Sequence, residues 1–313
     1  MHICSMIGHR INCILRLLAF SILLLAYLLS SAQSPKVIVL GFDGLSGWGV
    51  NQTPTPVFTK ARTQGASTLK AKAVFPTSSS PNWASMIMGA SPDEHGIRSN
   101  KWKRTKLIGK SFCGKEKGKI FPTIFGVLRE QKPDSKIYAV HHWNDFARLT
   151  DLDAFNKITN ARNEFHTADK AIKIIKEKQP DFLFLHFDHC DHAGHEFGHD
   201  TREYFESIKV ADSLAGAIIE ATKVAGTFEQ TYFIITSDHG GIGKGHGGKT
   251  AREVEIPWII FGPKIKANHT LPDNSINQYD TAATIAFIFG LKQPDCWIAK
   301  PVSEAFSSSS SAK

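Results

Sequence analysis

Aspartate and histidine side chains gather just after three apolar segments of the chain. Asp43 lies at the carboxyl end of the stretch KVIVLGFDG (36–44), DHCDHAGH follows DFLFLHF, and DHGGIGKGH follows TYFIITS. Carboxylate and imidazole together suit zinc, manganese or iron better than calcium, which prefers oxygen ligands. One Asp–His pair would be more often structural, but three such clusters behind apolar runs are hard to explain as satisfied core residues. The sequence therefore predicts a divalent-metal site.

Three consecutive serines stand in the segment FPTSSSPNWASMIMGA (75–90). A serine run is usually a solvated loop, but this one opens directly into the apolar segment 83–90, which predicts a buried helix. A hydroxyl near a bound metal can act as a nucleophile, and backbone N–H groups at the start of a helix favour an anion. The triple serine is therefore predicted to be a nucleophile loop facing a site for two metal ions.

The elements that must position these residues alternate between strands and helices. Apolar runs predict strands, and helical spacing of apolar residues predicts helices. The expected strands are 36–44, 136–143, 181–189, 231–241 and 255–263, and the expected helices are 123–131, 167–179, 202–226 and 278–290. This alternation predicts an α/β fold with a mostly parallel central sheet flanked by helices on both faces. In such sheets ligands bind beyond the carboxyl ends of the strands, where the three clusters are expected to meet.

The two ends of the chain differ from its middle. Arg10 and Arg16 precede an apolar run (17–29) that is followed by small residues, which is the pattern of a secretory signal. We expect a signal peptide over 1–33, a single catalytic domain over 34–303, and a disordered, serine-rich tail over 304–313. These features predict a secreted, periplasmic or extracellular protein with no transmembrane domain after signal removal. An uncleaved anchor helix is the alternative.

Charge and cysteine usage narrow the classes of partner. The net charge is +8, and the densest basic stretches are 101–110 and 115–119. They form either a solvated face or a field that attracts anionic substrates. Aromatic-interleaved basic motifs are missing from the sequence, so no nucleic-acid-binding module is expected. Beyond the signal, Cys113, Cys190 and Cys296 allow at most one disulfide, and no CxxC pair indicates a structural zinc site.

The order of these motifs resembles the type I phosphodiesterase/nucleotide pyrophosphatase family of the alkaline phosphatase superfamily. That family has a strand ending in Asp-Gly, then FPT-x-[TS]-x-PN, G-x-x-P-x-x-HGI, D-x-x-GH and SDHG. This chain has GFDG, FPTSSSPN, GASPDEHGI, DHAGH and SDHG, followed by GHGG. The resemblance runs from residue 36 to about residue 302. It implies an alkaline-phosphatase-like three-layer sandwich and a hydrolase that acts on phosphate diester or pyrophosphate bonds.

The resemblance also implies roles for particular residues. Ser79 falls at the position of the family nucleophile, and Asn82 falls where an asparagine helps to hold a phosphate oxygen. Two divalent ions, zinc by resemblance, would take two ligand sets: Asp43, Ser79, Asp238 and His239 for one, and Asp191, His195 and His246 for the other. Ser79 would form a covalent phospho-enzyme that water then hydrolyses. The substrate would be a small anionic phosphate ester.

Several alternatives remain open at this stage. Asp188 competes with Asp191 as a ligand, although the D-x-x-GH spacing favours Asp191. Trp83 replaces a histidine often found in the family and is expected to pack as a core aromatic. His141 and His142 are candidates for the cleft wall, whereas Cys190 is expected to be a buried small residue.

The activity itself has alternatives as well. A phosphomonoesterase would need cations such as those of 101–104 or Lys244 to hold the extra phosphate oxygens. A sulfatase would need a convertible cysteine or serine followed by an arginine, and that arginine is missing where the chain reads SSPNW. The alternative that is not an enzyme is a non-catalytic metal-binding protein at the cell surface. The leaving group, whether a nucleotide, a lipid head group or a sugar, is left undetermined.

Overall fold

A single sheet runs through the centre of the described residues. The computed structural model describes residues 34–114 and 117–307. Within these residues, eight strands pair in the order β4-β3-β5-β1-β6-β7-β2-β8. In chain order they are β1 (Lys36–Phe42), β2 (Ala66–Lys72), β3 (Ile137–His141), β4 (Lys157–Asn160), β5 (Phe182–Phe187), β6 (Thr231–Ser237), β7 (Glu255–Phe261) and β8 (His269–Thr270).

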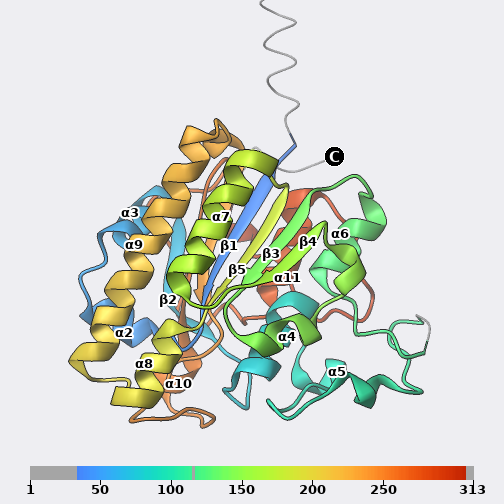
Figure 1. The fold of residues 1–313 in the computed structure, drawn as a ribbon, viewed down its shortest axis with the longest axis horizontal. Coiled ribbons are helices and arrows are strands. Elements are labelled where there is room, and N and C mark those ends of the chain that lie inside the picture. Colours follow the sequence, from blue (N-terminus) through green and yellow to red (C-terminus); the bar gives the residue numbers. More distant parts are fainter. Residues whose placement is uncertain (1–33, 115–116, 308–313) are drawn as a thin grey trace, which may run out of the picture. The chain divides into compact units, whose positions relative to one another are not determined.

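Most neighbouring strands run parallel, and β7 is the exception. β1 pairs in parallel with β5 and β6, and β3 pairs in parallel with β4 and β5. β7 is antiparallel to both β6 and β2. The central strand β1, blue in Figure 1, places Val37 opposite Phe182 on one side and Tyr232 on the other. The predicted mostly parallel sheet is confirmed, and the carboxyl ends of β1, β5 and β6 share one edge.

Helices cover both faces of the sheet, as the sequence predicts (Figure 1). Val37 and Val39 of β1 belong to a core that also contains side chains of α4, α6 and α11. Ile38 and Leu40 belong to a second core with α3, α7 and α9. Because both faces of β1 are buried, its sequence is a nearly continuous apolar run. The helices are α2 (Gly47–Gln52), α3 (Pro56–Gln64), α4 (Ser79–Met88), α5 (Pro92–His95), α6 (Ile124–Gln131), α7 (Glu164–Lys178), α8 (His189–Phe197), α9 (Arg202–Val224), α10 (Ala251–Val254) and α11 (Asp280–Phe289).

The end of the packed chain lies beyond the boundary predicted at residue 303. A short 3-10 helix spans Ser303–Ala305, and both Ala305 and Phe306 are buried. Phe306 also forms a β-bridge with Ile265. Residues 304–307 are therefore part of the domain, and the rest of the expected tail, like the expected signal peptide, lies outside the described residues. Within the described part of the chain, no helix is both long and apolar enough to cross a membrane.

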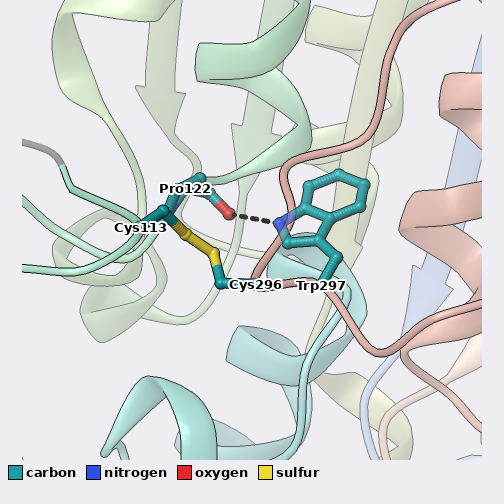
Figure 2. Close-up of a disulfide and its surroundings, with 4 residues drawn as sticks. All are labelled: Cys113, Pro122, Cys296 and Trp297. Atoms are coloured by element: carbon teal, nitrogen blue, oxygen red, sulfur yellow. Dashed lines mark hydrogen bonds between the residues drawn. A yellow bond between two sulfur atoms is a disulfide. The ribbon is translucent and has the colours of Figure 1, made fainter.

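One disulfide joins two segments that are far apart in the sequence. Cys113 and Cys296 are bonded, with their Cα atoms 5.6 Å apart. Figure 2 shows the indole of the next residue, Trp297, donating its N–H to the carbonyl of Pro122 at 3.0 Å. Cys190 is buried and free. The sequence allowed at most one disulfide among Cys113, Cys190 and Cys296, and this pairing is consistent with that limit.

A buried histidine fixes the turn that follows α4. The imidazole of His95 accepts the N–H of Ile97 at Nδ1, over 3.0 Å, and its Nε2 lies 3.0 Å from the hydroxyl of Ser85. The helix that contains it, α5, starts with a capping box between Ser91 and Glu94. Burial lowers the pKa of His95 to about 3, with a smaller effect from the charge of Arg98. His95 is therefore held in its neutral form.

This buried neutral histidine predicts a loss of stability in mild acid. The unfolded chain binds the proton near pH 6.5 and the folded chain only near pH 3, so the stability is complete above pH 6.5 and falls as the pH drops toward 3. At pH 4.5 we expect a loss of about 2–3 kcal/mol relative to neutral pH from this residue alone. Urea unfolding of the wild type and of His95→Gln at several pH values measures this loss. The difference between their free energies of unfolding should become smaller in acid. His192→Gln, which replaces an exposed histidine, is the control. If the difference in free energy of unfolding between wild type and His95→Gln did not change with pH, or changed equally for His192→Gln, His95 would not be the cause of the acid sensitivity.

Candidate active site

The predicted site residues meet at the carboxyl edge of the three central strands. Asp43 directly follows β1, Asp238 and His239 directly follow β6, and Asp191 lies in the first turn of α8, which follows β5. Ser79 is the first residue of α4, after an N-cap at Ser78 that makes no side-chain capping bond. The strand order therefore brings together residues that come from distant parts of the chain.

Asp43, Ser79, Asp238 and His239, here called site A, surround one imidazole nitrogen. Nε2 of His239 lies 3.4 Å from Oδ1 of Asp43 and 3.2 Å from Oδ2 of Asp238. The Ser79 hydroxyl oxygen lies 3.5 Å from the same nitrogen. All four side chains are buried. This places the predicted nucleophile against the first predicted ligand set.

Asp191, His195 and His246, here called site B, lie directly beside site A. Nε2 of His195 is 3.2 Å from Oδ2 of Asp191, and Nε2 of His246 is 3.7 Å from Oδ1 of the same carboxylate. The two histidine Nε2 atoms are 3.1 Å apart. The rings of His239 and His246 stack with centroids 3.8 Å apart, so the two sites adjoin.

The three histidines are all oriented through their other ring nitrogen. Nδ1 of His239 lies 2.9 Å from the carbonyl of Gly240, Nδ1 of His246 lies 2.7 Å from that of Thr77, and Nδ1 of His195 lies 2.9 Å from that of Lys244. A carbonyl only accepts, so each Nδ1 carries the hydrogen and each Nε2 presents a lone pair. Two lone pairs 3.1 Å apart, those of His195 and His246, repel unless a cation lies between them. This is the arrangement that metal-binding histidines adopt.

The carboxylates also carry unused acceptor atoms. Among the described residues, Oδ1 of Asp43, Oδ1 of Asp191 and Oδ2 of Asp238 are buried without a hydrogen-bond partner. Burial and the charges of Asp43 and Asp191 raise the pKa of Asp238 well above its usual value. Burial also opposes the charge on Asp191, but the neighbouring imidazoles of His195 and His199 outweigh it and hold its pKa below the usual range. Because buried carboxylate oxygens face free imidazole lone pairs, the residues present fit divalent cations.

A tryptophan holds one of these carboxylates in place. Trp83 is fully buried on α4, and its indole N–H donates to Oδ2 of Asp43 at 2.9 Å. Nε2 of His186, in β5, lies 3.3 Å from the same oxygen. Trp83 is therefore a core aromatic, as expected, and it also orients Asp43 so that Oδ1 is turned toward site A.

The loop before α4 is fixed by Asn82. Its amide donates to the carbonyls of Pro76 and Ser78, both at 2.9 Å, and its oxygen accepts the N–H of Val74 at 2.8 Å. These bonds use both amide hydrogens, which leaves little donor capacity for a phosphate oxygen. The predicted role of Asn82 in substrate binding stays a prediction, while its contacts are those of a residue that shapes the nucleophile loop.

Asn100 and Arg148 contact Ser80, the residue after the predicted nucleophile, and were not singled out from the sequence. Oδ1 of Asn100 accepts the N–H of Ser80 at 2.7 Å, and the asparagine itself is exposed. The guanidinium of Arg148 donates to the hydroxyl of Ser80 at 3.0 Å and to the carbonyl of Asn100. Arg148 also pairs with Asp145 at 2.7 Å. Neither residue belongs to a local motif, so only the folded chain reveals their position.

His199 is a residue beside site B that sequence reasoning missed. It is buried, and its Nε2 lies 3.8 Å from Oδ1 of Asp191. Its ring fills the space over Gly194 and Gly241, where an added Cβ would collide with it. The four-residue spacing of Asp191, His195 and His199 was the available signal.

The other candidates near the site have structural partners. Nδ1 of His141 contacts the carbonyl of Trp143 at 2.8 Å, and Nε2 of His189 contacts that of Ser207 at 3.2 Å. His192 is exposed and pairs with Glu196 at 3.4 Å. Cys190 is buried, which raises the pKa of its thiol to about 12 and keeps it unreactive. These findings agree with the expectation that Cys190 is a buried small residue.

Comparisons with known sequences identify a matching family. The family model described as type I phosphodiesterase/nucleotide pyrophosphatase matches residues 37–242. Ectonucleotide pyrophosphatase/phosphodiesterase family member 1 of Mus musculus is 27% identical over 225 residues, which are 66% of this chain and 24% of that protein. GPI ethanolamine phosphate transferase 1 of Yarrowia lipolytica is 26% identical over 251 residues, 70% of this chain and 27% of that protein. The aligned segment thus spans about a quarter of the length of these relatives.

Solved structures share the fold at lower sequence identity. Murine ectonucleotide pyrophosphatase/phosphodiesterase 5 superposes with a TM-score of 0.71 at 18% identity, covering 88% of this chain and all of that one. A variant of the same murine protein, described as inactive, was solved in complex with AMP. A 2-O GAG sulfatase superposes equally well, with a TM-score of 0.71 at 15% identity, covering 88% of this chain and 74% of that one. The alkaline-phosphatase-like fold expected from the sequence is confirmed.

Proposed function

Because the chain belongs to the type I phosphodiesterase/nucleotide pyrophosphatase family of hydrolases, we propose that it is a secreted two-metal phosphodiesterase or pyrophosphatase. The observation that carries the proposal is the position of Ser79. Its hydroxyl is the first side chain of α4 and lies 3.5 Å from Nε2 of His239, at the boundary of sites A and B. A serine there faces unpaired carboxylate oxygens and imidazole lone pairs.

Each part of the site has a task in this reaction. Asp43, Ser79, Asp238 and His239 would hold one cation, and Asp191, His195 and His246 would hold the other. Two such ions, zinc by family resemblance, would favour the serine alkoxide and neutralise charge on the phosphoryl group. The Ser79 oxygen would attack phosphorus, the alcohol or phosphate leaving group would depart on the opposite side, and water would hydrolyse the phosphoserine.

The phosphate oxygens need donors beside the nucleophile. The N-terminus of α4 supplies backbone N–H groups and a favourable dipole. The exposed amide of Asn100, whose oxygen is anchored on the N–H of Ser80, is better placed to donate to a phosphate oxygen than the amide of Asn82, which the loop already uses. We assign Asn100 this role and expect a small anionic phosphate ester as the substrate.

Secretion is supported by two independent features. The N-terminal sequence has the charged, apolar and small-residue parts of a signal peptide. The disulfide between Cys113 and Cys296 (Figure 2) is of a kind that persists in oxidising compartments. An extracellular or periplasmic location agrees with both.

A phosphomonoesterase is the second candidate, and Arg148 is the observation that favours it. A monoester carries an additional negative charge, and the Arg148 guanidinium lies 3.0 Å from the hydroxyl of the residue next to Ser79. Its pairing with Asp145 offsets part of that charge. The diester reading is preferred because the family match points to it.

A paired turnover assay tests the proposal. The purified chain is assayed on bis(p-nitrophenyl) phosphate and p-nitrophenyl phosphate, with zinc and after chelation. We expect zinc-dependent cleavage with a higher kcat/KM for the diester. A preference for the monoester would move the function to a phosphatase. Without zinc-dependent turnover of these esters or of a nucleotide pyrophosphate, the catalytic proposal would be refuted and the binding-protein reading favoured.

A further inference from the structure

The positive charge of the chain is concentrated in one segment that the active site does not use. Residues 101–114 and 117–119, here called the basic lobe, contain seven Lys or Arg side chains and no Asp or Glu, whereas the net charge of the whole chain is +8. The lobe follows α5 and is drawn in blue-green at the lower right of Figure 1. Its two stretches are neighbours in space, because the N–H of Gly118 donates to the carbonyl of Lys110 at 2.9 Å.

The inner side of the lobe is anchored to the rest of the domain. Trp102 and Leu107 are buried among the side chains of the first core. The guanidinium of Arg104 donates to the carbonyl of Thr150 at 2.9 Å. The disulfide shown in Figure 2 fixes Cys113. Because these contacts hold the backbone, the outer side chains are presented from a defined surface.

The lysines on the outer side of the lobe have no acidic partners. Five of them are exposed and form no ion pair with any residue that the structure describes: Lys101, Lys103, Lys106, Lys110 and Lys117. Elsewhere on the surface, Lys70 and Lys209 each pair with a carboxylate, at 2.8 and 2.7 Å. A Cβ added at Gly109 or Gly118 would meet no atom within 4 Å, so the lobe stands clear of neighbouring segments. The lobe therefore offers a row of free ammonium groups.

We propose that the basic lobe binds a polyanionic polysaccharide of the sulfated or carboxylated kind. Like charges on one short segment repel one another, and a polymer with repeated anionic groups neutralises them while it releases its own counterions. Six of the seven cations are lysines. An ammonium group is a point charge on a flexible stem, which suits a row of spaced anions, whereas bidentate recognition of a single phosphate favours arginine.

Two other polyanionic partners fit the lobe less well. Nucleic-acid bases stack on exposed aromatic side chains, but Trp102 is buried and Phe112 packs against Phe121, with ring centroids 5.3 Å apart. An anionic membrane also attracts lysines, but stable binding gains from apolar side chains that enter the lipid. Ile108, 79% exposed, is the single large apolar side chain of the lobe that is exposed, and isolated exposed aliphatic residues are ordinary.

Binding of the purified chain to fluorescein-labelled heparin, the probe for a sulfated polysaccharide, tests the proposal. Fluorescence anisotropy is measured at about 0.1 M salt, with labelled dextran as the neutral polymer. We expect Lys106→Gln/Lys110→Gln to bind heparin about tenfold more weakly than the wild type, with a shallower dependence of log affinity on log salt. Lys173→Gln/Lys176→Gln removes two exposed charges from α7 and should keep the wild-type affinity.

Sedimentation with vesicles of phosphatidylcholine and phosphatidylserine is the second readout. Ile108→Ser should leave the affinity for heparin unchanged. Vesicle binding that is lost in Ile108→Ser, without binding to heparin, would assign the lobe to a membrane and overturn the proposal. Equal weakening in the two double-lysine variants, or no preference of the wild type for heparin over dextran, would also overturn it. Circular dichroism checks that each variant is folded. Because no turnover is measured, the result is independent of whether the chain hydrolyses phosphate diesters.

Discussion

Replacing Ser79 by alanine is expected to lower kcat for phosphate-ester hydrolysis by at least about a thousandfold. The Ser79 hydroxyl lies 3.5 Å from Nε2 of His239, and Ser79 is the first residue of a helix whose N–H groups favour an anion, so its loss removes the proposed nucleophile from the site. The measurement is steady-state turnover of whichever ester the wild type prefers, together with acid trapping of the phosphoserine, which the variant should not form.

The two neighbouring serines supply matched controls for this experiment. Ser78 makes no capping bond with its side chain, so Ser78→Ala should keep most of the activity. Ser80 is buried and its hydroxyl accepts from Arg148, so Ser80→Ala tests the loop rather than the nucleophile. Zinc binding by Ser79→Ala should remain measurable, because the carboxylates and histidines are intact. Retention of wild-type turnover in Ser79→Ala would rule out the covalent mechanism.

Chelation of divalent metal is expected to lower the melting temperature by about 10 °C. An ion that is bound at a thousand times its Kd stabilises the folded state by ~4 kcal/mol, and each kcal/mol is worth about 2–4 °C in a domain of this size class. The physical source is the set of buried carboxylate oxygens without hydrogen-bond partners, which repel one another when no cation is bound. Differential scanning fluorimetry before chelation, after it, and after zinc is returned measures the effect.

Variants distinguish specific stabilisation from a general salt effect. Asp191→Asn removes a charge from site B and should greatly reduce the increase in melting temperature that zinc produces. Lys209→Ala breaks an exposed ion pair with Glu206 and should leave the shift unchanged. Equal melting temperatures with and without chelator would show that the cluster does not hold metal when folded.

Strands and helices with continuous or periodic apolar patterns were predictable from the sequence. β1, β5, β6 and β7 are buried along almost their whole length, so their composition alone indicates them. The prediction missed β4, whose four residues are exposed or half-buried, and β8, which has two residues. It also missed β2, whose sequence ASTLKAK mixes polar and apolar residues and which owes its place to pairing with β7.

Candidate site residues could be found from the sequence where the candidate ligand follows its strand closely. Asp43, Asp238 and His239 stand directly after apolar runs, and the structure brings them together. His186 lies inside the run FLFLHF, where it looks like one more strand residue. Asn100 reaches the start of α4 because the chain turns back after α5, and the N–H it binds belongs to Ser80, 20 residues earlier in the chain. Such tertiary contacts leave no local pattern to find.

The central position of β1 has a consequence for how the chain acquires its site. Val37 pairs with Phe182 and Tyr232, so the first strand of the domain stays unpaired until residues far downstream are available. Contacts of such long sequence separation slow folding, because loop-closure entropy must be lost before they form. Asp43 comes with this first strand and His246 with a loop after β6, so the complete ligand set exists only once the sheet has closed. Under the proposed two-metal function, an emerging chain would therefore bind metal only as a last step, and truncated chains should remain metal-free.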